Sequence, residues 1–575
     1  MSCRTSRDPI VTGWYGSDRF VDRLSALGIE HVALNPGASI RGFHDSLVNP
    51  PGRAPSLVLA LHEEIAVAMA HGYVKASGRP MAVGLHDTVG LLHGSMAIFN
   101  AWVDRAPMLL VVGTGPMDAA HRRPWLDWIH TVGEQGELVR HLTVWNEQPA
   151  SLDALLSAST RARRASRTGA GGPALLGFDI ALQESAADAP PAGPTAIRLD
   201  VPRIGPDPAA IEELASAVRG ASRPVFVTDR PLSAAASASL VRLAERLGAG
   251  LVELGGGASF PVGHPNDLTE ASADAIRAAD HITFVEVRDP AFALGPVDLA
   301  TRRTEGPSRL APTASIGLGD LRDRSWMVTD SAGPERLEII ADAELALAAL
   351  DDALAGSQRD LDPAFADLRA RPEPVPPDSP VAARGIHRAH LGRVLAAALD
   401  GHDWVLAHGQ LGGWARRILR FRPGQFLGRS GGEGLGYGPG ATVGAALALR
   451  GSGTIVVGLQ GDGDLLYAPQ ALWTAAAEGL PLLMVIDNNR TYGKDEQHQR
   501  VLAKERGRPE ANVLRGIAID GPAVDLTGLA RSLGVAAEGP IADFADLAPA
   551  LARAVERVRA GEPAVVEVRT HPSDR

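Results

Sequence analysis

The stretch Gly-Asp-Gly-Asp at residues 461–464 and the pair Asn-Asn at residues 488–489 organise the interpretation of the whole chain. A helix-like run and then an apolar run separate them, so that Asp462 and Asn489 lie 27 positions apart. Glycines allow a backbone to approach a phosphate closely, and a carboxylate with an amide oxygen are hard ligands of the kind that Mg²⁺ accepts. The pattern predicts a clamp for a metal ion and a diphosphate.

Length and composition indicate a large globular protein. The chain has 575 residues, of which 45% are hydrophobic and 21% charged. This length exceeds what one hydrophobic core supports, so three domains of ordinary size are expected. The net charge of −11 comes with no basic block, which argues against nucleic acid as a partner.

Cysteine content and hydropathy indicate the cellular location to expect. Cys3 is the only cysteine, so neither an internal disulfide nor a thiolate metal site can form, and a reducing setting is expected. The first twenty residues contain no long apolar segment, and no run elsewhere approaches the ~18 apolar residues of a membrane helix. The sequence therefore predicts a cytoplasmic protein without a membrane partner.

Strand-like apolar runs alternate with helix-like runs along the chain. This alternation predicts parallel βαβ units, and hence an α/β fold of consecutive doubly wound parallel sheets. Loose segments at residues 185–203 and 356–384 divide the chain into three predicted domains, at residues 9–184, 204–355 and 385–575. The predicted strands are at residues 31–34, 57–60, 80–85, 108–113, 224–227, 250–254 and 281–287.

The GDG motif followed by a strand that ends in two asparagines resembles the diphosphate motif of thiamine diphosphate (ThDP) enzymes. The wording at residues 471–476 and 488–493 is similar to the benzoylformate decarboxylase and acetolactate synthase group. The resemblance implies the three-domain fold of that family: a pyrimidine-binding, a middle and a diphosphate-binding domain. It also implies ThDP and Mg²⁺ as cofactors, while the middle third shows no flavin signature, so FAD is not expected.

Glu63 is the predicted catalytic carboxylate. A His-Glu pair at residues 62–63 could suggest a zinc protease, but the required second histidine is absent because position 66 is Ala. The resemblance instead implies that Glu63, nine residues before Gly72-Tyr73, lies against N1′ of the aminopyrimidine and helps to activate thiazolium C2. The alternative is a solvated carboxylate that stabilises a helix N-terminus.

Two histidines of the segment after residue 85 are candidates for proton transfer. His86 occupies the position of an active-site histidine in benzoylformate decarboxylase-like relatives, and a pKa near 6.5 suits it to exchange protons near neutrality. His93 stands where the family usually has asparagine and could line the same pocket. Hydrogen-bonded packing histidines are the alternative for both.

The resemblance also implies a full set of metal and cofactor contacts. The metal would be held by Asp462, Asn489 and the backbone carbonyl of Thr491. Leu435 would lie beneath ThDP and force its two rings into a V, and the Glu433 carbonyl would accept a hydrogen bond from the 4′-amino group. The full set of predicted cofactor-binding residues is Gly409, Gln410, Glu433, Leu435, Gly461, Asp462, Gly463, Asp464 and Asn489.

The sequence departs from the family pattern at three positions. Glu433 replaces a glycine, Asp464 replaces a small hydroxyl residue, and Ala38 replaces the serine of the decarboxylases, with Ser39 one position later. A carboxylate beside a diphosphate is repulsive, so Asp464 is expected to face the metal's water shell or solvent. The arginines and tryptophans of residues 118–130 could hold an anionic or aromatic substrate, or form an ordinary surface rim.

The resemblance implies an enzyme, a lyase or transferase that breaks or makes a carbon–carbon bond beside a carbonyl. Decarboxylation of a 2-oxo acid, with or without carboligation, is the leading expectation. One rival is hydrolytic or retro-benzoin cleavage of a diketone or acyloin, and another is a ThDP-binding assembly partner without turnover. A homodimer or homotetramer with active sites at the subunit interface is expected.

Overall fold

The computed structural model describes residues 13–123, 127–190, 196–199, 201–295, 311–319, 336–370, 376, 378–382 and 384–571. The chain forms two compact units. The first comprises Met1–Val201 together with Gly431–Ala448, and the second comprises Pro202–Ser430 together with Leu449–Arg575. No helix within the described ranges combines the length and the apolar character that crossing a membrane requires.

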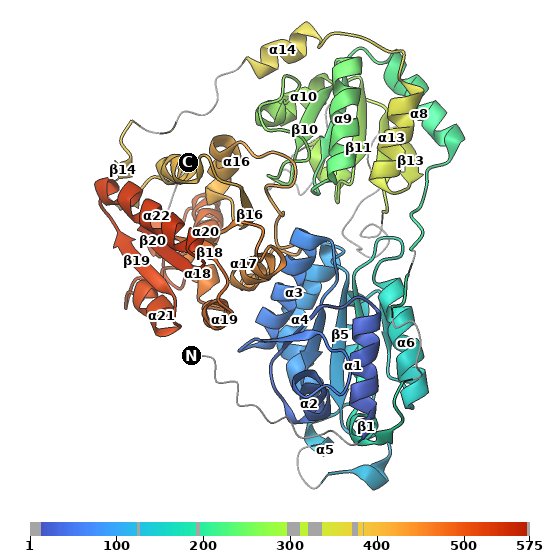
Figure 1. Cartoon of the computed structure of the whole chain (residues 1–575). Helices are drawn as coiled ribbons and strands as arrows, with labels where there is room; N and C mark the ends of the chain where they lie inside the picture. The colour runs from blue at the N-terminus through green and yellow to red at the C-terminus, as the bar shows by residue number, and fades with distance from the viewer. Residues whose placement is uncertain are drawn as a thin grey trace. The chain divides into compact units, whose positions relative to one another are not determined.

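A six-stranded parallel sheet forms the centre of the first unit (Figure 1), in the order β3-β2-β4-β5-β7-β6. Its central strands are continuous buried apolar runs, as expected for a parallel sheet with both faces covered. All four strands predicted for this part of the chain are present. The strands are β2 (His31–Leu34), β3 (Ser56–Leu59), β4 (Ala82–Leu85), β5 (Met108–Thr114), β6 (Trp145–Glu147) and β7 (Pro173–Asp179).

Helices cover both faces of this sheet (Figure 1). On one face α1 packs against α2 and α6, and on the other α3 packs against α4 and α17. These helices are α1 (Gly16–Ala26), α2 (Arg41–Val48), α3 (Glu63–Ser77), α4 (Asp87–Val103), α6 (Leu152–Ala165) and α17 (Tyr437–Ala448). The short elements are β1 (Trp14–Tyr15), which pairs with β8 (Ala186–Ala187), α5 (Asp127–His130), α7 (Ile180–Glu184), η1 (Ala38–Ile40), η2 (Ala119–His121) and η3 (Gln135–Leu142).

The second unit contains two five-stranded parallel sheets. The first has the order β10-β9-β11-β12-β13, with α8, α9 and α13 sharing one hydrophobic core and α10 and α14 another. The strands predicted at 224–227, 250–254 and 281–287 are all present. The elements are α8 (Pro208–Gly220), β9 (Pro224–Thr228), α9 (Ala234–Leu247), β10 (Gly250–Glu253), η4 (Thr269–Ala271), α10 (Ser272–Ala278), β11 (His281–Val285), α11 (Pro290–Leu294), β12 (Thr313–Gly317), β13 (Arg336–Ile340), α13 (Ala343–Ala353) and α14 (Pro363–Arg369).

The other sheet of this unit carries the Gly-Asp-Gly motif and has the order β16-β17-β18-β20-β19. A hydrophobic core joins its strands to α15, α16 and α22. Three parallel α/β sheets in series confirm the predicted fold class, whereas the domain boundaries stay a prediction. The elements are β14 (Val381–Ala382), β15 (Gly385–Ile386), α15 (Arg388–Leu399), β16 (Trp404–His408), η5 (Leu411–Gly413), α16 (Trp414–Leu419), β17 (Ile455–Gly461), α18 (Asp462–Leu465), α19 (Ala471–Ala477), β18 (Leu482–Asn488), α20 (Gly493–Glu505), η6 (Glu510–Asn512), α21 (Leu526–Ser532), β19 (Ala536–Ile541), α22 (Phe544–Arg559) and β20 (Ala564–Arg569).

Helices α3 and α17 pack with their backbones nearly in contact. A Cβ atom at Gly72 would lie 2.0 Å from the carbonyl oxygen of Ala441, and one at Gly444 would lie 1.9 Å from that of Met69. Atoms cannot approach so closely, so glycine is required on both helices. Glu63 is the first residue of α3, and the packing of α3 on α17 therefore helps to position it.

Gly72→Ala is expected to destabilise the protein by about 1–3 kcal/mol, because the methyl group forces α3 away from α17. The shift of the urea midpoint measures this effect. Gly220→Ala is the matched control, since among the described residues no atom lies within 4 Å of its added Cβ. Equal midpoints for the two variants would contradict the tight packing.

Candidate functional site

Asp462 and Asn489 stand at the carboxyl ends of two neighbouring parallel strands. Gly461, the last residue of β17, pairs in register with Asp487 of β18, so the residues that follow each strand emerge at one sheet edge. Both are buried, with 4% of Asp462 and 6% of Asn489 exposed. Ligands of α/β proteins bind outside such strand ends. The two predicted metal ligands thus come from one edge of one sheet.

The two asparagines have different partners. Asn488 is used within the sheet, because its Nδ2 donates to Glu567 Oε1 at 2.7 Å and its Oδ1 accepts from the backbone N–H of Arg490 at 3.1 Å. Asn489 Oδ1 accepts one hydrogen bond, from the N–H of Thr491 at 3.2 Å. Since a carbonyl oxygen has two lone pairs, the Asn489 amide retains capacity for a metal ion.

The charge around Asp462 fits a divalent cation. Burial, with a smaller contribution from the nearby Asp487 carboxylate, raises the pKa of Asp462 to about 7. Asp487 is itself paired with Arg388, at 2.7 Å. A cation at Asp462 would remove the cost of a buried negative charge, and carboxylate, amide and backbone oxygens are the donors that Mg²⁺ prefers. The donor set therefore fits the predicted metal.

The glycines around this edge have separate functions. Gly461 leaves open space beside its backbone, as the nearest atom to an added Cβ is Asp464 Cβ at 4.0 Å. Gly463 is needed for packing, because an added Cβ would lie 2.7 Å from the Tyr492 ring. Gly409 has a φ of +97° and its Cβ would lie 2.0 Å from the Leu459 carbonyl oxygen, so only glycine suits this position.

Asp464 and Gln410 contact protein groups at this edge. Asp464 accepts a hydrogen bond from Gln460 Nε2 and lies 3.6 Å from His408 Nε2, so its charge is shared with neighbouring side chains. Gln410 Nε2 donates to the Gly255 carbonyl at 3.0 Å, in the loop after β10. His408 was not predicted; its position as the last residue of β16, at the same sheet edge, is the signal that could have identified it.

Glu63 begins α3 in the first unit, and its side chain is buried with 6% of the residue exposed. An added Cβ at Gly90 would lie only 3.1 Å from Glu63 Oε1, so the glycine of α4 makes room for the carboxylate. His62 caps the helix by accepting from the N–H of Glu64 at 3.1 Å. A buried carboxylate differs from the solvated first-turn residue that was the alternative.

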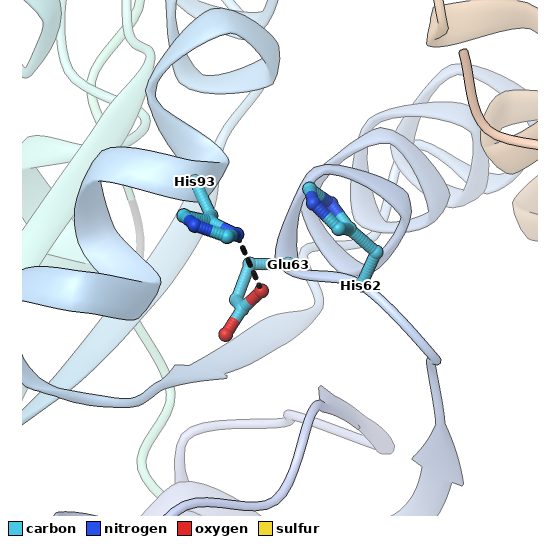
Figure 2. Close-up of side chains that lie close together, drawn as sticks. All are labelled: His62, Glu63 and His93. Atoms are coloured by element: carbon cyan, nitrogen blue, oxygen red, sulfur yellow. Dashed lines mark ion pairs between the residues drawn. The ribbon is translucent and has the colours of Figure 1, made fainter.

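His93 lies close to Glu63. Its Nδ1 is 3.7 Å from Glu63 Oε2, and its ring stacks on that of His62 with centroids 5.1 Å apart (Figure 2). Burial lowers the pKa of His62. Ligand atoms of these three residues lie within 4.8 Å of one another, a spacing that could hold a cation or share a proton. The HExxH spacing rule missed this grouping because the second histidine comes from α4.

His86 is held by Ser39. The Ser39 hydroxyl lies 2.8 Å from His86 Nδ1, and a Cβ at Gly37 would lie 2.3 Å from His86 Cγ, so the histidine packs directly on the turn before η1. Burial and the neighbouring His130, whose ring lies edge-on at 5.1 Å, lower the pKa of His86. Serine is displaced by one position relative to the family pattern, and here its hydroxyl orients the imidazole.

Asp87 adds a buried carboxylate next to His86. It has a φ of +49°, a conformation that is unusual for a residue other than glycine. The carboxylate accepts hydrogen bonds from Thr131 Oγ1 at 2.9 Å and from Gln135 Nε2, and burial raises its pKa. The sequence analysis did not predict Asp87 as a site residue. Its position directly after His86 is the feature that could have identified it.

The glycine cluster before α17 contains one of the departures from the family pattern. Glu433 has a φ of +57°, the left-handed conformation that favours glycine, and its side chain is exposed. Its neighbours Gly432 and Gly434 leave no room for a Cβ, which would lie 2.2 Å from Phe99 and 2.1 Å from Met96. Leu435 remains 38% exposed, as a residue that contacts a ligand would be.

The loop at residues 118–130 approaches His86 through two residues. Arg123 Nη1 donates to the Ala38 carbonyl at 2.9 Å, and its charge also contributes to lowering the pKa of His86. His130 lies against His86. Trp125 and the side chain of Trp128 lie outside the described part of the chain, so the predicted tryptophans are not placed.

Comparisons with known proteins agree with this geometry. Residues 15–173 match the model of the thiamine pyrophosphate enzyme N-terminal TPP binding domain, and residues 407–568 match that of the C-terminal TPP binding domain. The chain is 28% identical to benzoylformate decarboxylase of Pseudomonas aeruginosa over 486 residues, covering 83% of this chain and 85% of that protein. It is 25% identical to acetolactate synthase isozyme 1 large subunit of Escherichia coli over 503 residues, covering 85% and 84%.

Solved structures share the fold. The ThDP-dependent 4-hydroxybenzoylformate decarboxylase of Rhodococcus jostii has a TM-score of 0.78 at 23% identity, covering 98% of this chain and 100% of that one. Benzoylformate decarboxylase from Polynucleobacter necessarius has a TM-score of 0.79 at 20% identity, covering 97% and 99%. The two matched domains, with the buried Asp462 and Asn489 in one and Glu63 in the other, show that the chain belongs to the thiamine diphosphate-dependent enzymes, in the group of the benzoylformate decarboxylases and acetolactate synthases.

Proposed function

We propose that this chain is a ThDP- and Mg²⁺-dependent enzyme that decarboxylates a 2-oxo acid, with or without transfer of the product unit to a second carbonyl. The observation that carries the proposal is the buried carboxylate of Asp462 beside Asn489, at the ends of neighbouring parallel strands. Relatives named as benzoylformate decarboxylase and acetolactate synthase support the choice of reaction.

Each predicted residue has a chemical part in this reaction. Asp462, Asn489 and the Thr491 carbonyl would hold Mg²⁺ against the diphosphate. When bound, ThDP supplies the carbon nucleophile and the electron sink, which is chemistry of the cofactor itself. Glu63 would share a proton at N1′ of the pyrimidine, and its buried position between α3 and α4 keeps competing water away.

His86 would hold or move the proton that the product receives. Because burial and His130 lower its pKa, the imidazole is neutral at pH 7 and has one donor and one acceptor nitrogen. Ser39 contacts Nδ1, and Nε2 is the ring nitrogen that would exchange the proton with the reacting atoms. The positive charge of Arg123 beside the His86 turn favours a substrate with a carboxylate.

Ser39→Ala is expected to lower kcat about fivefold, the worth of one hydrogen bond of about 1 kcal/mol, because the His86 ring loses its orienting partner. The pH dependence of kcat should shift as well, since the hydroxyl contacts the titrating nitrogen. Ser46→Ala is a suitable control, as Ser46 is also buried but bonds Asp18 and Ser17. An unchanged pH dependence of kcat in Ser39→Ala would indicate that His86 only packs within the fold and takes no part in proton transfer.

A substrate panel tests the proposed function. Protein loaded with ThDP and Mg²⁺ is offered aromatic and aliphatic 2-oxo acids, an acyloin and a diketone, and products and CO₂ are measured. Release of CO₂ with an aldehyde or acyloin from an oxo acid is expected. Cleavage of the diketone or acyloin without CO₂ would replace decarboxylation by the rival activity. No turnover across the panel would support a silent assembly partner.

Further proposals concern the oligomeric state, the cellular location and the absence of a flavin. We place Glu63 of one copy with Asp462 of another in a homodimer or homotetramer. Mixing Glu63→Gln with Asp462→Asn protein should then restore about one quarter of the wild-type activity, because half of randomly mixed dimers carry one intact site. No recovery on mixing would argue against shared sites. A cytoplasmic location and a flavin-free, colourless protein remain predictions that cell fractionation and the absorbance spectrum check.

A further inference from the structure

A cavity lies in the unit that contains the middle sheet, and none of its lining residues is assigned to the cofactor. It has a volume of about 490 Å³ and is lined by the loop after β10, the end of α14 and helix α16. Small-molecule sites in proteins have volumes of about 300–1,000 Å³. The cavity is therefore large enough for a small metabolite.

The charge of this cavity is opposite to that of the chain. Four arginines line it, from α14, α16 and the residue that follows α16, against two carboxylates, so the lining carries two excess positive charges without counting His264. The protein as a whole has a net charge of −11. The arginines are Arg369, Arg416, Arg417 and Arg420, and the carboxylates are Asp267 and Glu270. A concave surface with this excess concentrates anions.

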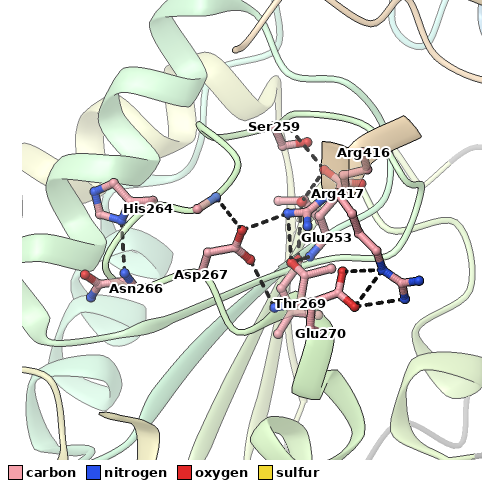
Figure 3. Close-up of polar contacts among 12 residues, drawn as sticks. Glu253, Ser259, His264, Asn266, Asp267, Thr269, Glu270, Arg416 and Arg417 are labelled. Atoms are coloured by element: carbon pink, nitrogen blue, oxygen red, sulfur yellow. Dashed lines mark hydrogen bonds and ion pairs between the residues drawn. The ribbon is translucent and has the colours of Figure 1, made fainter. Parts of the chain in front are cut away.

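Arg416 is held in place by a network of hydrogen bonds (Figure 3). Its Nη2 lies 3.0 Å from Asp267 Oδ2 and 3.1 Å from Thr269 Oγ1. Asp267 accepts in turn from the N–H groups of Gly263 and Thr269, both at 3.0 Å. A guanidinium with fixed neighbours loses little freedom when it binds a ligand.

The same arginine keeps one donor without an acceptor. Only 7% of Arg416 is exposed, and within the described residues its buried Nε–H has no hydrogen-bond partner. Leaving a buried charged donor unsatisfied is costly, but this Nε–H has less than 1 Å² of accessible surface and is enclosed by protein. A ligand in the cavity would instead contact the more exposed guanidinium groups of Arg369, Arg417 and Arg420. Arg417, bonded to both Glu270 oxygens at 3.1 and 3.0 Å, stands nearer the solvent.

Apart from His264, the rest of the lining is apolar. Val262, Leu268 and Leu368 contribute side chains beside the arginines. A ligand that fills the cavity thus needs an anionic end for the guanidinium groups and an apolar body for these residues. An inorganic anion alone would leave the apolar part of the cavity unused.

We propose that this cavity is a binding site for a small organic anion, a phosphomonoester or a dicarboxylate carried on an apolar body. The site is independent of the proposed reaction, because none of its residues belongs to the cofactor or catalytic set. The loop that lines it also accepts, through the Gly255 carbonyl, the hydrogen bond of Gln410. An occupant would therefore stabilise a loop in contact with the predicted Gly409-Gln410 turn.

Isothermal titration of the ThDP- and Mg²⁺-loaded protein tests the proposal. AMP and phthalate are the probes, since both join a dianion to a flat apolar body, and adenosine is the neutral control. Binding of AMP or phthalate, but not of adenosine, is expected. Binding of AMP alone would identify a phosphomonoester site, and binding of phthalate alone a dicarboxylate site. If neither anion binds, the proposal is wrong.

A pair of double variants locates the binding. Arg417→Gln with Arg420→Gln should weaken binding about tenfold or more, through the loss of two charge-assisted contacts. The control is the double variant Arg393→Gln with Arg553→Gln, which removes the same charge at another place. Arg393 is exposed, as Arg420 is. Arg553 forms an ion pair with Glu538, as Arg417 does with Glu270. This control should bind as wild type does. Equal affinity of the two double variants would overturn the assignment.

Two further measurements separate this site from others. Arg369→Gln, at an exposed helix end, should weaken binding about threefold, and it provides a test if the double variant unfolds. Anion binding should also persist in protein without ThDP. If the substrate panel shows no turnover while AMP or phthalate still binds at the arginines, the proposed function fails and the anion site stands.

Discussion

Replacement of Glu63 by Gln is expected to lower kcat roughly 10²- to 10⁴-fold, the range for loss of a general acid–base group. The substitution preserves size and hydrogen bonding but removes the shared proton. Because the metal and diphosphate ligands are in the other unit, binding of ThDP should be largely retained. Exchange of the thiazolium C2 proton with deuterium, followed by NMR in the loaded protein, measures the affected step directly.

Glu64→Gln is the matched control for this prediction. Glu64 is the neighbouring residue of the same helix turn and is more exposed than Glu63. Its substitution should leave both kcat and C2 exchange near wild-type values. Unchanged exchange in Glu63→Gln would remove Glu63 from catalysis and leave it a role in stabilising the N-terminus of α3.

Asp462→Asn is expected to weaken cofactor binding while it stabilises the metal-free protein. The affinity for Mg²⁺ and ThDP should fall more than about 10- to 100-fold. Loss of a residue that only hydrogen-bonds to a metal ligand already lowers metal affinity by that factor. The metal-free variant should nevertheless be more stable than the wild type at pH 8. Titration of ThDP in the presence of Mg²⁺ and thermal unfolding of the metal-free proteins measure the two effects.

The sign of the stability effect follows from the pKa of Asp462. In the folded protein it is raised from 3.8 to about 7, so the folded state binds the proton more tightly than the unfolded state. The stability of the metal-free wild type therefore declines as the pH rises from about 4 to about 7. With about 1.4 kcal/mol for each pKa unit, the decline amounts to as much as about 4 kcal/mol, which the asparagine avoids.

Controls define what would contradict this prediction. Asp495→Asn, an exposed carboxylate in the first turn of α20, should change neither cofactor affinity nor the pH dependence of stability. Added Mg²⁺ and ThDP should raise the melting temperature of the wild type but not that of Asp462→Asn. A variant that binds both with wild-type affinity would exclude Asp462 as a metal ligand.

The fold was predictable because it depends on local patterns, whereas the metal and diphosphate clamp stays a prediction. Alternating apolar runs determine parallel strands, and all seven predicted strands are present in the structure. The spacing of Asp462 and Asn489 corresponds to one βαβ unit, which places both residues at adjacent strand ends. Where backbone geometry controls a residue, as at Gly409, sequence and structure also agree.

Contacts between distant segments could not be predicted in the same way. Three such contacts join residues from different elements. His93 lies close to Glu63, His86 packs on Gly37 and Ser39, and Asp464 lies close to His408. The distances between such residues depend on how helices pack on the sheet, and one added methyl group can change them, as Gly72 illustrates.

By itself the sequence determined three parallel α/β sheets, because strand periodicity is a local property of the chain, and its motifs identified the ThDP-dependent family. The metal and diphosphate clamp at residues 461–489 and the catalytic role of Glu63 stay predictions. The tertiary structure alone decided which groups surround those residues. It assigned Asn488 to the sheet and Asn489 to the open edge, and it brought Arg416 to a cavity against the loop after β10. Side-chain burial and charge depend on packing between segments far apart in the chain, which no local pattern encodes.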